Sequence, residues 1–248
     1  MPRRTLISTV SVLVFLAAWE VAPRLYLVDG NYTSRPSLIL AAGLGIVRDT
    51  AFVHDLSVSS SEFAAGFALA IAVGVPLGLL LGAFPVLRYL VDPLLMAIYS
   101  TPYLALLPIL VVWLGIGMGS KIAAVFAGGV IPIVVNSMAG VREVDASCIL
   151  AARSFCAGKL DVFVKVMLPA SLPAVMMGIR LGLSRAVLGV VVAEMYVSQA
   201  GVGNQIMRFG SAFRIDYLVF YVLLVSIFGF AATRAVRLLE QRLWTAEK

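Results

Sequence analysis

Six long apolar runs determine the fold class of this chain. A bilayer core about 30 Å thick needs about 20 apolar residues in helical conformation, because every backbone N–H and C=O in lipid must be bonded within its own segment. The chain is 61% hydrophobic and 13% charged, against roughly 25% charged in an average soluble domain. The qualifying runs are Leu6 to Val28, Phe63 to Phe84, Tyr89 to Leu114, Ile122 to Ala139, Ala170 to Val197 and Tyr217 to Thr233. They predict an all-α, polytopic membrane protein with about six transmembrane helices. No linker separates a second unit, so we expect one transmembrane domain over residues 1–248.

The first run has two interpretations. It is weakened by Glu20 and Pro23, and basic residues precede it, as in a secretory signal peptide. No clear small-x-small cleavage site follows its apolar part, so we expect a retained first helix. The alternative leaves five spans and places the termini of the mature protein on opposite sides.

The placement of Lys and Arg predicts the orientation. The formal net charge is +6, but the basic residues are scattered at the ends of apolar runs and form no continuous strip for nucleic acid. Most of them lie at the two termini or in the segment 141–169, whereas Lys121 falls on the other side. The positive-inside rule therefore places both termini and segment 141–169 in the cytoplasm of a bacterial cell, with the chain multi-pass in its inner membrane. A large outer loop, about Asp29 to Ser61, then faces the opposite side.

Small residues recur every four positions in the second run. They are Gly66, Ala70, Gly74, Gly78 and Gly82. Because residues i and i+4 share a helix face, this spacing predicts a groove in which another backbone approaches closely. We favour helix packing within the subunit for Gly66, Gly74, Gly78 and Gly82, and a dimer seam or a pathway lining are the alternatives.

The third run contains Pro93, Pro102 and Pro108, each of which removes a backbone donor and favours a bend. Bent helices suit a gated cavity, although purely structural kinks have the same sequence. Candidate solute-pathway residues are the polar side chains in or between spans, each with helix packing as its alternative: Ser100, Thr101, Tyr103, Asn136, Ser184 and Glu194. Two arginines of the fifth run, Arg180 and Arg185, are five residues apart and do not share a face; we favour anchoring or subunit pairing over a pathway role for them.

The chain lacks the motifs of an enzyme. No phosphate-binding loop is present, and the glycines before Lys121 have the wrong spacing for one. The single histidine, His54, excludes a histidine-based triad or a paired-histidine metal site, and no Gly-x-Ser-x-Gly elbow occurs. Cys148 and Cys156 match no metal-site spacing, so we expect reduced thiols. We predict a protein that is not an enzyme and itself binds no metal and no cofactor.

Segment 141–169 is cationic and resembles soluble sequence, although it lies between two apolar runs. Asp145 or Ser147 can cap a helix, and Ala146 to Phe155 is rich in helix formers. A glycine interrupts the pattern, Lys159 to Met167 resumes it, and Pro169 ends this second piece before the fifth span. The segment therefore predicts two short helices with a bend.

The first of these helices has two candidate environments. Ile149, Ala152 and Cys156 share one of its faces, and the small Ala151-Ala152 pair would let it enter a shallow groove on a cytoplasmic partner. An amphipathic helix lying on the anionic inner leaflet has the same residue types. The residues alone leave both open.

Segment 141–169 resembles the cytoplasmic loop of permease subunits of binding-protein-dependent ABC importers, whose pattern is Glu-Ala-Ala-x3-Gly-x9-Ile-x-Leu-Pro. The alanines, the Ile position and the Leu-Pro ending match in spacing. Leu150 replaces the Glu, and Cys156 replaces the Gly, so the turn is expected to have moved to Gly158. The ATPase-coupling residues that this resemblance implies are Leu150, Ala151, Ala152, Cys156, Gly158, Val166, Leu168 and Pro169.

Further fragments, in order along the chain, resemble the nitrate/sulfonate/taurine branch of this family. They include Gly74-Val-Pro76-Leu-Gly78, Asp92-Pro93-Leu94-Leu95, Trp113-Leu-Gly115-Ile-Gly117 and Val191-Val192-Ala193-Glu194. The resemblance implies a type I importer permease that pairs with a second permease copy, expected to be a homodimer, and receives solute from an extracytoplasmic binding protein. It also implies docking on a cytoplasmic ATPase subunit, which holds ATP and Mg. The alternative is a secondary transporter or channel that needs no ATPase and uses ionisable groups of its spans.

Overall fold

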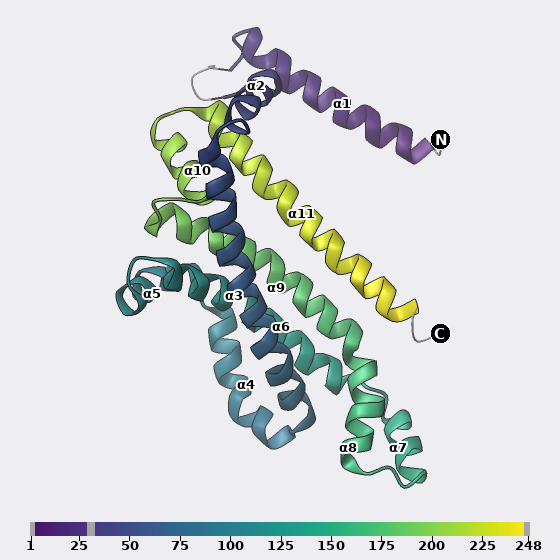
Figure 1. Ribbon diagram of the computed structural model, residues 1–248. Coiled ribbons are helices and arrows are strands. Elements are labelled where there is room, and N and C mark those ends of the chain that lie inside the picture. The colour runs from purple at the N-terminus through teal and green to yellow at the C-terminus, as the bar shows by residue number, and fades with distance from the viewer. Residues whose placement is uncertain (1–2, 29–32, 246–248) are drawn as a thin grey trace.

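The computed structural model describes residues 3–28 and 33–245, and this part of the chain is helical without strands (Figure 1). Its helices are α1 (Arg3–Arg24), α2 (Pro36–Ile46), α3 (Thr50–Ala83), α4 (Pro85–Ser100), a 3-10 turn (Tyr103–Leu106), α5 (Leu107–Leu114), α6 (Met118–Arg142), α7 (Ala146–Ser154), α8 (Lys159–Val162), a π-helical turn (Phe163–Met167), α9 (Leu168–Val197), α10 (Val202–Ser211) and α11 (Ile215–Thr245). Among the described residues, five helices are long and apolar enough to cross a membrane, and the bent pair of α4 with α5 makes a sixth candidate. The prediction of an all-α protein with about six spans is confirmed.

Helices α3, α6 and α9 form the core. Their contacting faces bury a continuous apolar cluster, in which Leu81, Ile133 and Ala186 are inaccessible to solvent. Helix α11 lies diagonally along the outside of this core, and α1 extends away from it, meeting the rest of the chain through α2 (Figure 1). The apolar side chains of α1 and α11 are mostly exposed, as expected for helices whose neighbours are lipid or another subunit.

The small-residue face of α3 lies against α6 of the same subunit. The face consists of Gly66, Ala70, Gly74, Gly78 and Gly82. A Cβ added at Gly78 would lie 2.5 Å from the carbonyl oxygen of Val134, so the two backbones are in direct contact there. At Ala70, the one position with a methyl group, α6 has Gly129, and a Cβ there would lie 3.1 Å from the Ala70 Cβ. The two helices are therefore complementary at the scale of single methyl groups.

The expected outer loop, Asp29 to Ser61, is largely helical instead. Residues 29–32 lie outside the described residues, but Pro36–Ile46 form α2, and α3 begins at Thr50, well before the expected Phe63. Asp49 caps α3 by accepting a hydrogen bond from the Ala51 N–H at 3.0 Å. With 34 residues, α3 is about 51 Å long, which exceeds the bilayer core. Its first turns include Asp55 and Ser59, whose side chains bond to the start of α10.

The second helix of segment 141–169 continues into the fifth span without interruption. Residues Lys159–Val197 form one helix of 39 residues, so the expectation that Pro169 separates the two is wrong. The Leu168 N–H bonds to the Phe163 carbonyl, five residues earlier, in the π-helical turn. A proline in the first turn of α9 lacks a backbone donor, and the wider turn before it accommodates this loss without a break.

Candidate functional site

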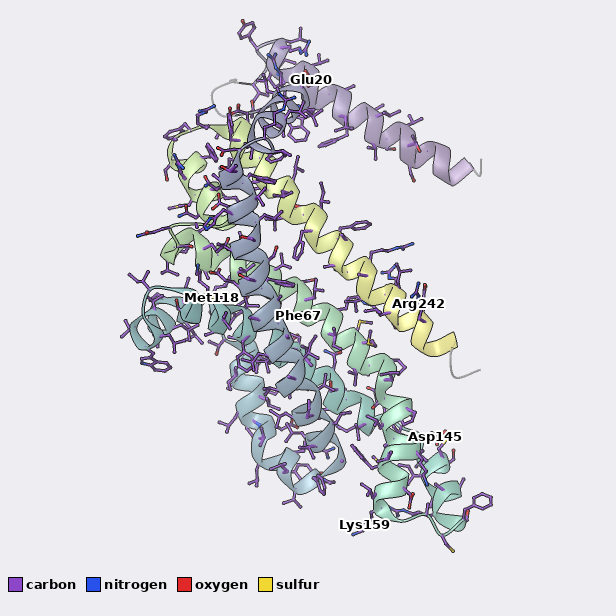
Figure 2. All side chains as sticks on the ribbon, in the orientation of Figure 1. Glu20, Phe67, Met118, Asp145, Lys159 and Arg242 are labelled. Atoms are coloured by element: carbon purple, nitrogen blue, oxygen red, sulfur yellow. The ribbon has the colours of Figure 1, made fainter. Side chains whose placement is uncertain are left out.

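The segment 141–169 projects from one end of the core, and we call it the projecting loop. Figure 2 shows Asp145 and Lys159 on its two helices, and Figure 1 places the loop at the same end of the molecule as the α3–α4 connection. Asp145 caps α7 by accepting a hydrogen bond from the Ser147 N–H at 2.8 Å, which holds the pKa of this carboxyl below its ordinary value. The predicted bend and first short helix, α7, are present, whereas the second helix, α8, is the first turn of the 39-residue helix that continues into the fifth span.

The bend of the projecting loop is at Cys156 and has not moved to Gly158. Cys156 has a φ of 58°, in the left-handed region, whereas Gly158 is extended. The Ala157 N–H bonds to the Ala152 carbonyl at 3.2 Å and the Cys156 N–H to the Arg153 carbonyl at 2.9 Å. This pair of bonds is the Schellman motif, which prefers glycine at its left-handed position. The family glycine therefore has a geometric reason, and this chain keeps the geometry with a cysteine.

Three large apolar side chains of the projecting loop are exposed. Leu150, Phe155 and Leu160 are 66%, 88% and 75% exposed, and the small Ala151 is exposed beside Leu150. Several exposed large apolar side chains on one projecting loop are typical of a protein interaction surface. Leu150, in the position where the family pattern has a charged Glu, extends this surface.

Most of the remaining residues of the predicted coupling set are half-buried within the projecting loop. Ile149 and Ala152 of α7 are half-buried, on the side of α7 that packs against the π-helical turn. Val166 and Leu168 are half-buried in and just after that turn, and Pro169 is exposed in the first turn of α9. Ile149, Ala152 and Cys156 therefore do not form one docking face: Ile149 and Ala152 are half-buried within the protein, and Cys156 is exposed.

The third span is broken in its middle. Helix α4 ends at Ser100, Thr101 and Pro102 are non-helical, and the second half begins at Tyr103 with a bend of 88°. Of the three prolines considered, Pro102 lies at the break, while the other two lie within or at the start of a helix. The Thr101 hydroxyl donates to the Ala97 carbonyl at 2.9 Å, and the Ser100 hydroxyl likewise bonds back into α4.

Two of the six predicted pathway residues line a cavity at this break. The Tyr103 hydroxyl donates to the backbone carbonyl of Arg185 at 2.6 Å, and Thr101 lines the same cavity as Tyr103. The Asn136 side chain donates to its own helix at 2.8 Å and packs against α9, and Ser184 is exposed with its hydroxyl directed at the Arg180 carbonyl. The structure does not bring the six residues together.

The sixth pathway candidate, Glu194, belongs to a buried polar cluster near the start of α10. Glu194 accepts a hydrogen bond from the Gly203 N–H at 2.7 Å. In the same cluster Lys121 and Glu62 form an ion pair with exposed fractions of only 5% and 2%, and the Lys121 ammonium donates to Ser198 at 3.0 Å. Lys121, which the charge distribution assigns to an outer segment, is thus buried against Glu62 of α3.

Polar residues of α3 complete the polar cluster by capping α10. Asp55 accepts from the Gly201 N–H at 2.7 Å, and Ser59 accepts from the Val202 N–H at 2.8 Å. The first backbone donors of a helix have no partner within the helix, so α3 and α9 together supply the missing acceptors. Sequence reasoning missed these residues, although Asp55, Ser59 and Glu62 have the i, i+4, i+7 spacing of one helix face.

Arg180 and Arg185 have different surroundings. Arg180 forms an ion pair with Glu240 of α11. Arg185 places its guanidinium 4.8 Å from the ring centroid of Tyr99, at the break in the third span. Arg180 therefore links α9 to α11, whereas Arg185, five residues later on the same helix, faces the broken span.

Comparison with known proteins identifies the family. Residues 74–245 match the family of binding-protein-dependent transport system inner membrane components. The taurine transport system permease protein of Escherichia coli is 28% identical over 99% of this chain and 92% of its own length. A putative aliphatic sulfonates transport permease protein of Bacillus subtilis is 31% identical over 93% of this chain and 83% of its own.

A solved structure shows the fold. The inward-facing MetNI methionine ABC transporter contains a chain that superimposes with a TM-score of 0.59 at 22% identity, covering 75% of this chain and 95% of that one. With the matched family and the relatives along nearly the whole length, this chain belongs to the binding-protein-dependent transport system inner membrane components and is the permease subunit of an ABC importer.

Proposed function

We propose that this permease forms the path for a small solute with an oxyanion group, of the nitrate, sulfonate or taurine class, and that the projecting loop couples the path to a separate cytoplasmic ATPase. The observation that carries the proposal is the exposure of Leu150, Ala151, Phe155 and Leu160, which lie on α7, at its C-cap and on α8, at one end of the molecule. ATP and Mg belong to the ATPase in this proposal, and the permease supplies only the docking contacts.

The proposed orientation places the projecting loop and both termini in the cytoplasm. The basic residues Arg142, Arg153, Lys159 and Lys165 on or beside this loop support it, since positive charge is enriched on cytoplasmic segments. The α3–α4 connection, with Arg88 close by, lies at the same end (Figure 1). An extracytoplasmic binding protein would then deliver solute at the opposite end, where α2 and α10 lie.

A second copy of this chain is the proposed partner within the membrane. The break between α4 and α5 opens on the surface of the subunit, where Tyr99 is 40% exposed. Polar and irregular backbone at membrane depth is tolerated only where protein or a water-filled cavity covers it. A homodimer whose broken spans face a shared path satisfies this requirement.

Substitution of Ala151 by glutamate tests the coupling role. Ala151 is exposed and small, so a charged side chain there would obstruct an apolar groove on the ATPase without disturbing the permease core. In proteoliposomes containing the permease, its ATPase and its binding protein, we expect Ala151→Glu to lower ATP-dependent uptake at least about tenfold and to abolish stimulation of ATP hydrolysis by loaded binding protein.

Ala151→Ser is the matched control. Serine keeps a small, uncharged side chain at the same exposed position, so a groove on the ATPase is not obstructed. We expect uptake within twofold of wild type. Equal coupling in Ala151→Glu and wild type would show that the projecting loop does not dock as proposed, and uptake that continues without any ATPase subunit would favour the secondary transporter.

A further inference from the structure

The break in the third span adjoins a cavity lined by three elements. The cavity has a volume of about 170 Å³, and its wall includes Tyr99, Thr101 and Tyr103 from the broken span, Phe126 from α6 and Arg185 from α9. Broken helices near the middle of a membrane are a recurrent place for solute and ion sites, because the interruption frees backbone and side-chain polar groups. This volume accommodates a small ion of a few heavy atoms.

Arg185 is the charged group of this cavity. It lies near the middle of α9, and among the residues that the structure describes no carboxylate forms an ion pair with it. The other cations within the core are paired, Arg180 with Glu240 and Lys121 with Glu62. A guanidinium inside a membrane protein is costly unless an anion compensates it, so an arginine left without a carboxylate is a candidate ligand group.

The surroundings hold Arg185 in position. The Tyr99 ring lies 4.8 Å from the guanidinium carbon, a cation–π contact that orients the guanidinium without using its N–H donors. The backbone at Arg185 is fixed by the Tyr103 hydroxyl at 2.6 Å, and Gly128 of α6 leaves room for that ring, since a Cβ there would lie 2.9 Å from it. The donors of Arg185 therefore remain available and preorganised at the cavity.

We infer that Arg185 binds the oxyanion group of the solute on its way through the permease, with Tyr99 as the residue that positions the guanidinium. This inference rests on the proposed function of the chain as an anion path. The planar fork of N–H donors on arginine matches the oxygens of a sulfonate or nitrate group in a bidentate manner. The Thr101 hydroxyl already donates its proton to the Ala97 carbonyl, and Arg185 is the charged side chain among the residues that line the cavity. Arg185 is therefore the residue that recognises the charge of the solute.

Equilibrium binding to the purified permease–ATPase complex, without binding protein or ATP, tests this inference. The probe is radiolabelled methanesulfonate, with dimethyl sulfone as a neutral competitor of similar shape. We expect Arg185→Gln to weaken methanesulfonate binding at least about tenfold, since charge-assisted bonds are lost, and dimethyl sulfone not to compete.

Arg214→Gln is the matched control for the loss of an arginine. Arg214 also stacks over a tyrosine, with its guanidinium carbon 4.0 Å from the Tyr217 ring centroid, but it is exposed and lies outside the cavity. Binding to this variant is expected within twofold of wild type. If Arg185→Gln does not assemble, Arg185→Lys is measured instead, and a several-fold loss is expected because an ammonium lacks the bidentate fork.

Three results would overturn the inference. The first is methanesulfonate binding that is unchanged in Arg185→Gln, or in Arg185→Lys if the glutamine variant does not assemble. The second is dimethyl sulfone that competes as well as unlabelled methanesulfonate. The third is displacement of the probe by phosphatidylglycerol together with unchanged uptake in both variants, which would assign the site to a lipid headgroup. Uptake by the reconstituted assembly separates this failure from that of the proposed function. If the Arg185 variants take up methanesulfonate at the wild-type rate in an ATP-dependent manner, only the proposed anion site is contradicted. If uptake by the wild-type protein does not depend on ATP, the proposed coupling is contradicted.

Discussion

Gly78 provides a direct test of how closely the α3 and α6 backbones approach. In Gly78→Ala the new Cβ would lie 2.5 Å from the Val134 carbonyl oxygen and 2.6 Å from the Ser137 Cβ. Ordinary contacts begin at 3.4 Å, so the methyl group overlaps the first atom by about 0.9 Å. The obstacle at Val134 is backbone, which cannot rotate away, and the two helices must therefore separate locally.

The cost of this separation follows from packing. Over-packing of a close-packed interface typically costs about 1–3 kcal/mol, and alanine recovers up to about 1 kcal/mol relative to glycine through helix propensity. With the full propensity gain, the net destabilisation of Gly78→Ala is about 0–2 kcal/mol. At about 2–4 °C per kcal/mol for a chain of this length, the melting temperature should fall by up to about 8 °C.

Thermal unfolding of the purified permease in detergent, followed by intrinsic fluorescence, measures this change. Gly229→Ala in α11 is the matched control, because no neighbouring atom lies within 4 Å of a Cβ at that position. There the propensity gain stands alone, and the melting temperature should rise or stay unchanged. A Gly78→Ala protein as stable as Gly229→Ala would refute the direct backbone contact between α3 and α6.

Two further substitutions test the turn of the projecting loop and the buried polar cluster. Cys156→Gly should stabilise the loop by up to about 1 kcal/mol, because glycine adopts a φ of 58° without the steric cost that cysteine has; hydrogen exchange of the loop amides should slow, and Cys156→Ala, which keeps a Cβ, should show no such gain. If the glycine and alanine variants exchange alike, the left-handed turn is wrong. Lys121→Met should lower the free energy of unfolding by about 3–5 kcal/mol, since it leaves Glu62 buried without its partner, and adding Glu62→Gln should recover most of this loss. A double-mutant cycle of unfolding free energies measures the coupling, and a value as small as that of a surface pair, below about 1 kcal/mol, would contradict the burial of this pair.

The membrane helices could be predicted from the sequence because they depend on a local property. An apolar run of sufficient length can adopt few conformations other than a helix in lipid. The small residues at i, i+4 spacing on α3 predict that another helix packs closely against this face. The beginning of α3 could not be predicted in the same way. Asp55, Ser59 and Glu62 have the composition of a solvated segment, and contacts with distant residues, the N-terminus of α10 and Lys121 of α6, make them buried.

The candidate site was predictable only where a motif is continuous in sequence. The two helices of the projecting loop follow from local helix signals, but the left-handed turn does not, because cysteine is an uncommon residue there. Arg180 and Arg185 are indistinguishable in sequence, and the structure separates them by the helices that lie opposite. Recognition of the cavity at Arg185 requires knowing that the break is at Pro102 and not at another proline of the same span.

The uninterrupted helix Lys159–Val197 has a mechanical consequence. Its 39 residues extend about 58 Å, so a rotation of about 5° around its midpoint moves each end by about 2.5 Å in opposite directions. A push on α8 would tilt the whole rod. Arg185 would move by about 0.9 Å, whereas Glu194, with its contacts to α10, lies farther from the midpoint and would move by about 2.1 Å. The helix would then act as a lever that moves the far end of the path more than its middle.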